Sequence, residues 1–116
     1  MKPLVYIAGP ISNPDKATKE RNVDNACMIW DLLRQNGVNA ICPHWSVRQE
    51  DVCNMTHDEW IQYDMEVLLP RCDALYRIPG DSVGAEMEVA WMRSHNKPVF
   101  YMMIHLLEWY FSCPSL

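Results

Sequence analysis

The chain has 116 residues, of which 49% are hydrophobic, and its formal net charge is −5 at pH 7. This length predicts one domain, residues 1–116, with a core large enough to fold without a disulfide or a metal. The acidic balance and the absence of a basic run argue against a nucleic acid polymer as partner and favour a small-molecule ligand.

The cysteine pattern and the apolar segments indicate a cytoplasmic protein. The chain has five cysteines and no Cys-x-x-Cys pair, which is typical of thiols kept free in a reducing compartment. No signal peptide precedes the first apolar run, and the most apolar segment, 99–111, is shorter than the ~20 residues of a membrane-spanning helix. We therefore expect no membrane partner.

The N-terminal third predicts a strand followed by a helix. Residues 4–8 form a short apolar run that ends at a glycine and a proline, which is typical of a buried strand. A helix is predicted over 16–36, because apolar side chains recur there at helical spacing. Asn13 or Asp15 is expected to cap its start, and Gly37 is placed to end it.

The middle of the chain predicts a second strand, a long loop and a second helix. Residues 38–42 form another apolar run, and the polar stretch 43–55 follows it. Thr56 and Glu59 match the capping-box pattern, so a helix is expected to begin there. Pro70 is expected to end that helix.

The remaining residues predict two further strands and a helix between them. The strands are expected at 72–78 and 99–104, and Ser82 is placed to cap a helix over 83–95. A short helix is preferred for 105–116. Strands that alternate with helices predict an α/β fold with a parallel sheet covered by helices.

This fold class predicts where a ligand binds. In open parallel sheets, ligands bind beyond the carboxyl ends of the strands, where the strand order reverses. The segments 9–13, 43–47 and 79–84 each follow a predicted strand. We expect these three segments to converge in space and to form the site.

Glu88 is the first candidate for chemistry. It lies one and a half turns into the predicted helix, beside the apolar face formed by Ala85, Val89 and Met92. A carboxylate in such a place can attack the anomeric carbon of a sugar and form a covalent glycosyl–enzyme. The alternative is an ordinary solvated glutamate, which is the better interpretation of Glu86.

Two glycine-containing turns are candidates for ligand binding. Ser82 and Gly84 lie at a predicted helix start, where free N–H groups and the helix dipole favour a phosphate or a sugar hydroxyl. Gly9-Pro10-Ile11-Ser12 permits close backbone approach, but it is not the Gly-x-Gly-x-x-Gly of dinucleotide sites. The alternatives are an ordinary serine cap and simple turns.

Asp64 and Tyr6 are candidates for supporting roles. A partly buried carboxylic acid at Asp64 would have a raised pKa and would be able to donate a proton, whereas an exposed acid would not. Tyr6 lies in a predicted core strand, where packing is the ordinary role of a tyrosine. Its buried hydroxyl would still need a partner, which a carboxylate would provide.

A zinc site is a weaker interpretation of the cysteines and histidines in the middle of the chain. Four side chains of the types that bind zinc fall in a short span, but their spacing matches the usual structural zinc sites poorly. No cysteine is marked as an activated nucleophile for a Cys–His hydrolase. We predict no metal and no organic cofactor. The four residues are Cys42, His44, Cys53 and His57.

Four stretches of sequence together suggest a family. Tyr6-Ile7-Ala8-Gly9-Pro10-Ile11-Ser12 and Ser82-Val83-Gly84-Ala85-Glu86-Met87-Glu88, with Cys72-Asp73-Ala74 and Asn96-Lys97-Pro98-Val99, resemble the nucleoside 2-deoxyribosyltransferase superfamily. The resemblance spans Leu4 to Phe100 and is closest to a small phage or bacterial branch that carries S-x-G-A-x-x-E. It implies a flavodoxin-like (Rossmann-like) three-layer sandwich with a parallel sheet of four to five strands.

The resemblance also implies roles for single residues. The nucleophilic glutamate of the family falls on Glu88, its strand tyrosine on Tyr6, and the aspartate that assists the leaving base on Asp64. Ser82 is similar to the phosphate-contacting serine of the 2′-deoxynucleoside 5′-monophosphate N-hydrolases, and His44 resembles a pocket histidine of those enzymes. The transferases usually carry an aspartate at the position of Ser82.

Two points of the resemblance concern binding and assembly. The N-hydrolases place an arginine where this chain has Ser12, which weakens the expectation of a phosphate preference. Family members borrow site residues from a neighbouring subunit, which implies a homo-oligomer, a dimer or larger. The interface is expected to be supplied by Trp91 with Met92 or by the apolar residues 109–111.

These observations lead to one expected function and two alternatives. We expect cleavage of the N-glycosidic bond of a nucleoside or a (deoxy)nucleoside 5′-monophosphate, with hydrolysis slightly preferred over base exchange because Ser82 replaces the aspartate of the transferases. The main alternative is a nucleotide-binding module that senses or sequesters its ligand without turnover. The third is a structural homo-oligomer that binds no nucleotide.

Overall fold

The computed structural model describes residues 2–46, 49 and 52–113. Its strands are β1 Leu4–Ala8, β2 Asn39–Ile41, β3 Ala74–Arg77 and β4 Val99–Phe100. Its helical elements are α1 Lys16–Gln35, η1 Pro43–Ser46, α3 His57–Tyr63, η2 Asp64–Leu68, η3 Leu69–Arg71, α4 Val83–Ser94 and α5 Met103–Ser112.

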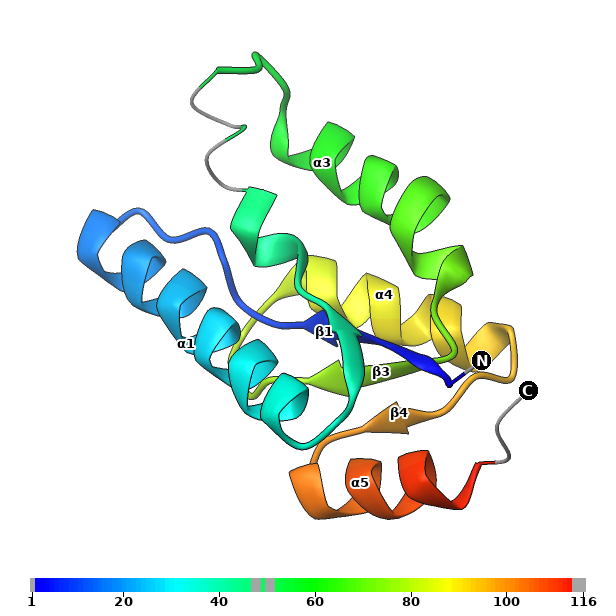
Figure 1. The fold of residues 1–116 in the computed structure, drawn as a ribbon. Helices are drawn as coiled ribbons and strands as arrows, with labels where there is room; N and C mark the ends of the chain where they lie inside the picture. The colour runs from blue at the N-terminus through cyan, green and yellow to red at the C-terminus, as the bar shows by residue number, and fades with distance from the viewer. Residues whose placement is uncertain (1, 47–48, 50–51, 114–116) are drawn as a thin grey trace.

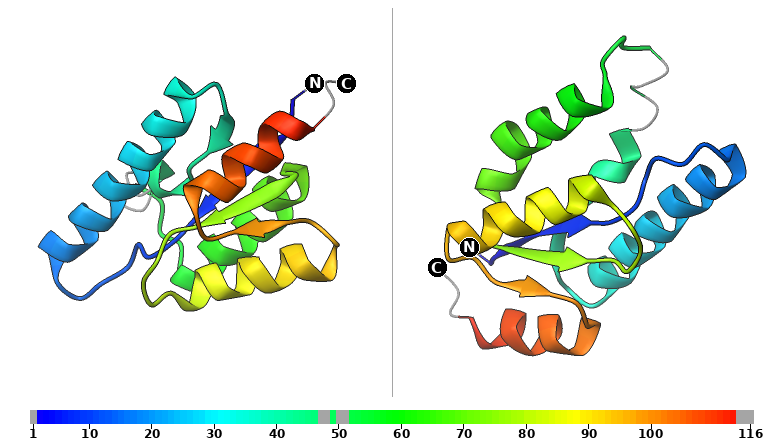
Figure 2. Two further views of the ribbon diagram at one scale, coloured as in Figure 1. Left: turned by 90° about the horizontal axis from the view of Figure 1, so that it is seen from below. Right: turned by 180° about the vertical axis from the view of Figure 1, so that it is seen from behind.

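The described strands form one parallel sheet in the order β2-β1-β3-β4. Figures 1 and 2 show helices on both sides of this sheet, so the fold is the three-layer α/β sandwich that the alternating pattern predicted. Side chains of β1 alternate between the layers, as in any strand. Val5 and Ile7 pack with α1 and α5, whereas Tyr6 and Ala8 pack with α4.

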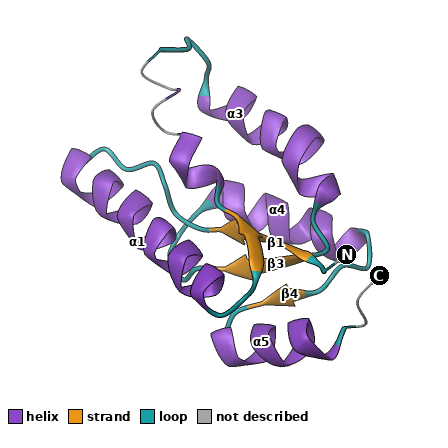
Figure 3. Cartoon of the chain, in the orientation of Figure 1, coloured by secondary structure: helices purple, strands orange, loops and turns teal. Residues whose placement is uncertain are grey.

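The strand order reverses beside β1. The chain moves from β1 outward to β2, returns across the sheet to β3 on the other side of β1, and then continues to β4. The loops that leave β1 and β3 lie against each other where they begin and then lead to helices on opposite faces of the sheet, α1 and α4. Figure 3 shows these loops at the carboxyl ends of their strands, and a crevice between such loops is the usual ligand site of this fold.

The ends of α1 follow the predicted signals. The Asp15 side chain, not that of Asn13, accepts a hydrogen bond from the Thr18 N–H and caps the helix. Gly37 follows the last turn with φ +80°, a conformation that glycine adopts without strain. The N–H groups of Gly37 and Val38 then bond back to carbonyls of the last turn, which completes a Schellman end.

The second predicted helix begins as expected but changes its pitch. Thr56 and Glu59 form the capping box at the start of α3. The helix widens to a π-helical turn at Asp64 and tightens to a 3₁₀ turn at Leu69, close to Pro70. The pattern of apolar side chains carries no signal for such a turn, which occurs frequently at functional sites.

The prediction of a strand over 99–104 was wrong. β4 contains only Val99 and Phe100, and α5 begins at Met103. The run Val99–Ile104 is continuously apolar, so its periodicity does not distinguish a strand from a helix. Leu106 and Tyr110, one turn apart on α5, are the side chains that enter the core.

Two residues expected at an oligomer interface lie in the core instead. Met92 and Tyr110 are 0% and 2% exposed, because each faces the sheet from its helix. None of the five cysteines, all of which lie in the described part of the chain, forms a disulfide. No helix of the described residues is both long enough and apolar enough to cross a bilayer.

Candidate active site

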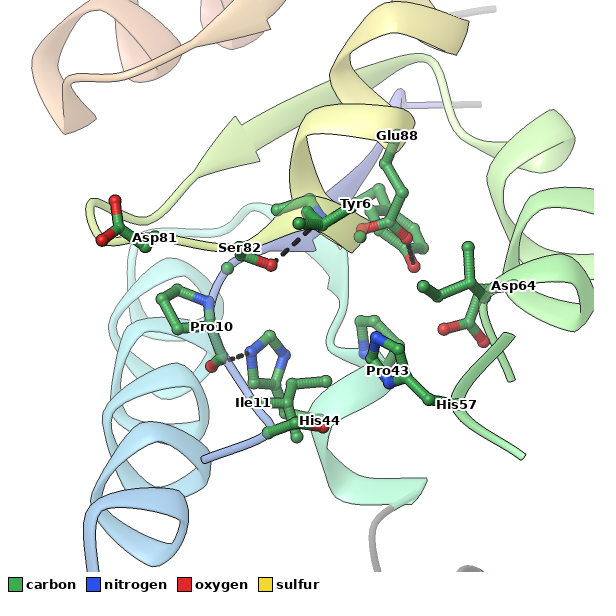
Figure 4. A pocket seen from close by; sticks show the side chains of 16 residues that line it. Tyr6, Pro10, Ile11, Pro43, His44, His57, Asp64, Asp81, Ser82 and Glu88 are labelled. Atoms are coloured by element: carbon green, nitrogen blue, oxygen red, sulfur yellow. Dashed lines mark hydrogen bonds between the residues drawn. The ribbon is translucent and has the colours of Figure 1, made fainter. Parts of the chain in front are cut away.

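A pocket of about 280 Å³ lies above the carboxyl ends of β1 and β3, with α3 on its far side. Figure 4 shows its side chains converging from β1, η1, α3 and α4. All ten residues that the sequence pointed to line this pocket. They are Tyr6, Gly9, Pro10, Ile11, Ser12, His44, Asp64, Ser82, Gly84 and Glu88.

Glu88 and Tyr6 form a buried hydrogen-bonded pair. The Tyr6 hydroxyl, on the central strand β1, donates to Glu88 Oε2 on α4. Glu88 is 8% exposed and Tyr6 is fully buried. Glu88 is held at this depth because Val89 and Met92, on the same side of α4, pack against the sheet. The pair therefore presents a fixed carboxyl group to the pocket.

Burial sets the protonation of the two pocket carboxyls. It raises the pKa of Glu88 to about 8, against the opposing effect of the Tyr6 hydroxyl; the charge of Asp64 raises this pKa further and that of Arg77 lowers it. Burial likewise raises the pKa of Asp64 to about 6, again opposed by the Tyr6 hydroxyl. Burial and the two carboxylates raise the pKa of Tyr6 well above 10.

Asp64 enters the pocket from a different element than Glu88. It is the first residue of the π-helical turn η2, and Figure 4 shows it beside the side chains of Tyr6 and Glu88. Two carboxyl groups that influence each other titrate as a pair, so their protons belong to the pair. Between pH about 6 and about 8 this pair holds one proton. It therefore offers one carboxylate and one carboxylic acid together.

The N-terminus of α4 forms another wall. The Ser82 Oγ accepts a hydrogen bond of 3.1 Å from the Ala85 N–H and caps the helix, as predicted. Gly84 faces α3, where a Cβ atom would lie 3.2 Å from the Ile61 Cδ1. Gly84 therefore lets α3 pack close to the start of α4, and it lines the pocket.

His44 supports the loop after β1. Its Nε2 lies 3.1 Å from the carbonyl oxygen of Pro10, and because a carbonyl only accepts, Nε2 carries the proton. The side chain is 1% exposed, and this burial lowers its pKa to about 4. His44 is therefore a neutral brace of the wall formed by residues 9–12.

Gly9 fits where no larger residue would. A Cβ atom at Gly9 would lie 2.7 Å from the Cβ of Ile78, which real side chains do not tolerate. The loops after β1 and β3 therefore pack against each other at this point. The predicted need for a glycine in this turn thus arises from protein packing beside the pocket.

His57 is a pocket residue that the site prediction missed. It was considered only as a zinc ligand, and the described residues contain no group of three or more metal-binding side chains. His57 is the first residue of α3 and lies seven positions before Asp64, two helical turns away. This spacing is the signal that could have placed the two side chains on a shared face. Pro43, Ile61 and Asp81 also line the pocket.

Glu86 is exposed as predicted, but it also has a partner. Its carboxylate accepts hydrogen bonds from the guanidinium of Arg77. Neither residue lines the pocket. This pair lies on the side of α4 turned away from Glu88.

Comparison with known proteins adds no relative. No family model matches the chain, and no curated protein matches it.

Proposed function

We propose that this protein cleaves the N-glycosidic bond of a nucleoside or of a (deoxy)nucleoside 5′-monophosphate, with Glu88 as the nucleophile. One observation carries the proposal: a nearly buried carboxyl group held by a tyrosine hydroxyl in a pocket that a second carboxyl group also lines. Two carboxyl groups with separate tasks are the usual apparatus for cleaving a glycosidic bond. The resemblance to nucleoside 2-deoxyribosyltransferases points the same way.

The proposed first step forms a glycosyl ester. A Glu88 carboxylate oxygen attacks C1′ while the bond from C1′ to the base nitrogen breaks, and the electron pair of that bond leaves with the base. Asp64 donates its proton to the departing base. The Tyr6 hydroxyl keeps the Glu88 carboxylate in place, because it bonds one oxygen and leaves the other for attack.

The proposed second step regenerates the site. Asp64, now a carboxylate, takes a proton from water, the water oxygen bonds to C1′, and the ester bond to Glu88 breaks. The products are the free sugar or sugar phosphate and the free base. A second base in place of water would give a transferase. We favour water because Ser82 occupies the place of the transferase aspartate.

The 5′ end of the substrate is assigned to the start of α4. The free N–H groups of a helix N-terminus and the Ser82 hydroxyl suit a phosphate or a hydroxyl group. The loop 9–12 lies on the neighbouring wall and is assigned to the sugar. The base would then lie toward α3, near Asp64.

The test is base release from a panel of nucleosides and their 5′-monophosphates, followed by chromatography. Glu88→Gln keeps the shape of the side chain but removes the nucleophile, so we expect turnover to fall by about a thousandfold or more. Glu86→Gln is the matched control, since it makes the same change two residues away outside the pocket. It should keep nearly full activity.

The possible outcomes separate the candidate functions. Release that needs a second base would identify a transferase. Nucleotide binding without any release, equal in wild type and Glu88→Gln, would contradict the proposal and leave a non-catalytic binding module. Release that survives in Glu88→Gln would remove Glu88 from the role of nucleophile.

A further inference from the structure

Arg77 is a charged residue in a place where charged residues are rare. It is the last residue of β3, a strand whose four residues are all buried, and it is 5% exposed. Removing a guanidinium from water is costly unless its N–H groups find partners. The hydrogen bonds of Arg77 therefore show which parts of the chain this buried side chain holds together.

The guanidinium of Arg77 joins three consecutive pieces of chain. Its Nη1 donates to the carbonyl oxygen of Ile78, and its Nη2 donates to that of Gly80 at 2.9 Å. Nε and Nη2 also donate to Glu86 Oε1, at 3.2 and 2.9 Å. One side chain thus ties the end of β3, the loop after it and the first turn of α4.

The loop that Arg77 holds is one wall of the pocket. Gly80 has φ +123°, and a Cβ atom there would lie 2.7 Å from Cγ of Pro10. The loop therefore packs directly against the neighbouring wall, residues 9–12. Asp81 and Ser82, which follow Gly80, line the pocket. A shift of this loop would move Ser82 and the start of α4 relative to residues 9–12, the wall assigned to the sugar.

The pair with Glu86 is the weaker part of this arrangement. The Glu86 side chain is 64% exposed, so water screens its attraction to Arg77. The bond to the Ile78 carbonyl is buried, and the Gly80 carbonyl, unlike Glu86, belongs to the loop itself. We therefore expect the carbonyl contacts, more than the ion pair, to determine where the loop sits.

We propose that Arg77 is a positioning residue, which holds residues 78–82 and the N-terminus of α4 in the geometry that receives the 5′ group of the substrate. This inference rests on the proposed function. Arg77 lies outside the pocket lining and acts through the loop. Its loss should weaken recognition of a 5′-phosphate more than recognition of the rest of the substrate.

The test compares a 2′-deoxynucleoside 5′-monophosphate that the wild type cleaves with its parent nucleoside. For Arg77→Met we expect KM for the monophosphate to rise about tenfold and KM for the nucleoside to change by less than about twofold. The variant also removes the charge that lowers the pKa of Glu88, so kcat should change by the same factor for both substrates. Arg77→Lys keeps the charge but lacks the planar fork, so its KM for the monophosphate should lie between those of the wild type and of Arg77→Met. Glu86→Gln, which keeps the carbonyl contacts, is the control and should resemble the wild type.

The inference is overturned if Arg77→Met leaves KM for the monophosphate unchanged, or if it raises KM equally for both substrates. It is also overturned if Glu86→Gln reproduces the effect, because the ion pair would then be the cause. If the wild type cleaves nothing, the proposed function has failed, and amide hydrogen exchange still tests the loop. We then expect the Ala85 and Glu86 amides to exchange faster in Arg77→Lys than in Glu86→Gln, and equal rates would contradict the inference.

Discussion

At the scale of single residues, the proposed chemistry depends on where one proton resides. Glu88 must be ionised to attack, and Asp64 must be protonated to help the base leave. The singly protonated pair prevails between pH about 6 and about 8, and the higher pKa of Glu88 places its proton mainly on Glu88. The reactive arrangement is therefore the minor form of this pair, in which the proton has moved to Asp64. A hydrogen bond from the Tyr6 hydroxyl stabilises the ionised form of either carboxyl group. The proton can therefore reside on one of them while the other is a stabilised carboxylate.

This coupling predicts a bell-shaped profile of kcat/KM against pH. Activity should fall below about 6, where the pair takes up a second proton, and above about 8, where it loses its last one. The variant Asp64→Asn should keep only the acidic limb, because Glu88 then titrates alone. The midpoint of that acidic limb should lie below pH 8, because removal of the Asp64 charge lowers the pKa of Glu88. A wild-type profile that is flat from pH 5 to 9 would contradict the coupling.

At the scale of elements, local signals specified the helix ends well and the end of the sheet poorly. Asp15, Gly37, Thr56 and Ser82 each cap or end a helix where the pattern predicted, because capping depends on a few adjacent residues. The boundary after Phe100 failed, because it depends on which side chains find space in the core. The π-helical turn at Asp64 has no local signal of its own.

The two glycines with positive φ allow a test of the loop packing. Gly80→Ala adds backbone strain and a clash with Pro10, so we expect it to lower the free energy of unfolding by at least about 2 kcal/mol and to weaken substrate binding. Gly37→Ala adds strain alone, since its Cβ would meet only the Phe111 ring at 3.8 Å. Gly37→Ala should lower the free energy of unfolding by about 1 kcal/mol and leave substrate binding unchanged. Equal effects of the two variants in urea unfolding would contradict the packing between the loops.

At the scale of the whole molecule, topology assembled a site that no single segment contains. The sequence indicated each wall separately, as a turn or helix start after a strand, and the reversal of strand order beside β1 brought those walls together. Arg77 could not be recognised in advance, because its partners are mainly backbone carbonyls, which every sequence has. His57 was hidden in a polar stretch, where a histidine is ordinarily solvated.

The buried acids also predict how stability responds to pH. Glu88 binds its proton more tightly in the folded chain, so its contribution is complete below its ordinary pKa of 4.5 and is lost as pH rises to about 8. Asp64 acts in the same direction between 3.8 and about 6. His44 acts oppositely, because only the unfolded imidazole takes up a proton between 6.5 and about 4.

Glu88→Gln should therefore lose less stability than the wild type between pH 6.5 and 8, where the contribution of His44 no longer changes with pH. Urea unfolding at these two pH values measures the difference, with Glu86→Gln as the control that should follow the wild type. An identical loss in Glu88→Gln and in the wild type would show that Glu88 does not carry a raised pKa.

The most direct test of Glu88 as the nucleophile is to trap the glycosyl ester during turnover. Protein quenched rapidly in acid with a substrate it cleaves is digested with trypsin, and the peptide 78–93, which contains Glu86 and Glu88, is analysed by mass spectrometry. The account predicts that the sugar or sugar phosphate is attached to Glu88, and that the adduct is absent from Glu88→Gln and present in Glu86→Gln. Turnover with no adduct at any quench time, or an adduct on another residue, would contradict it.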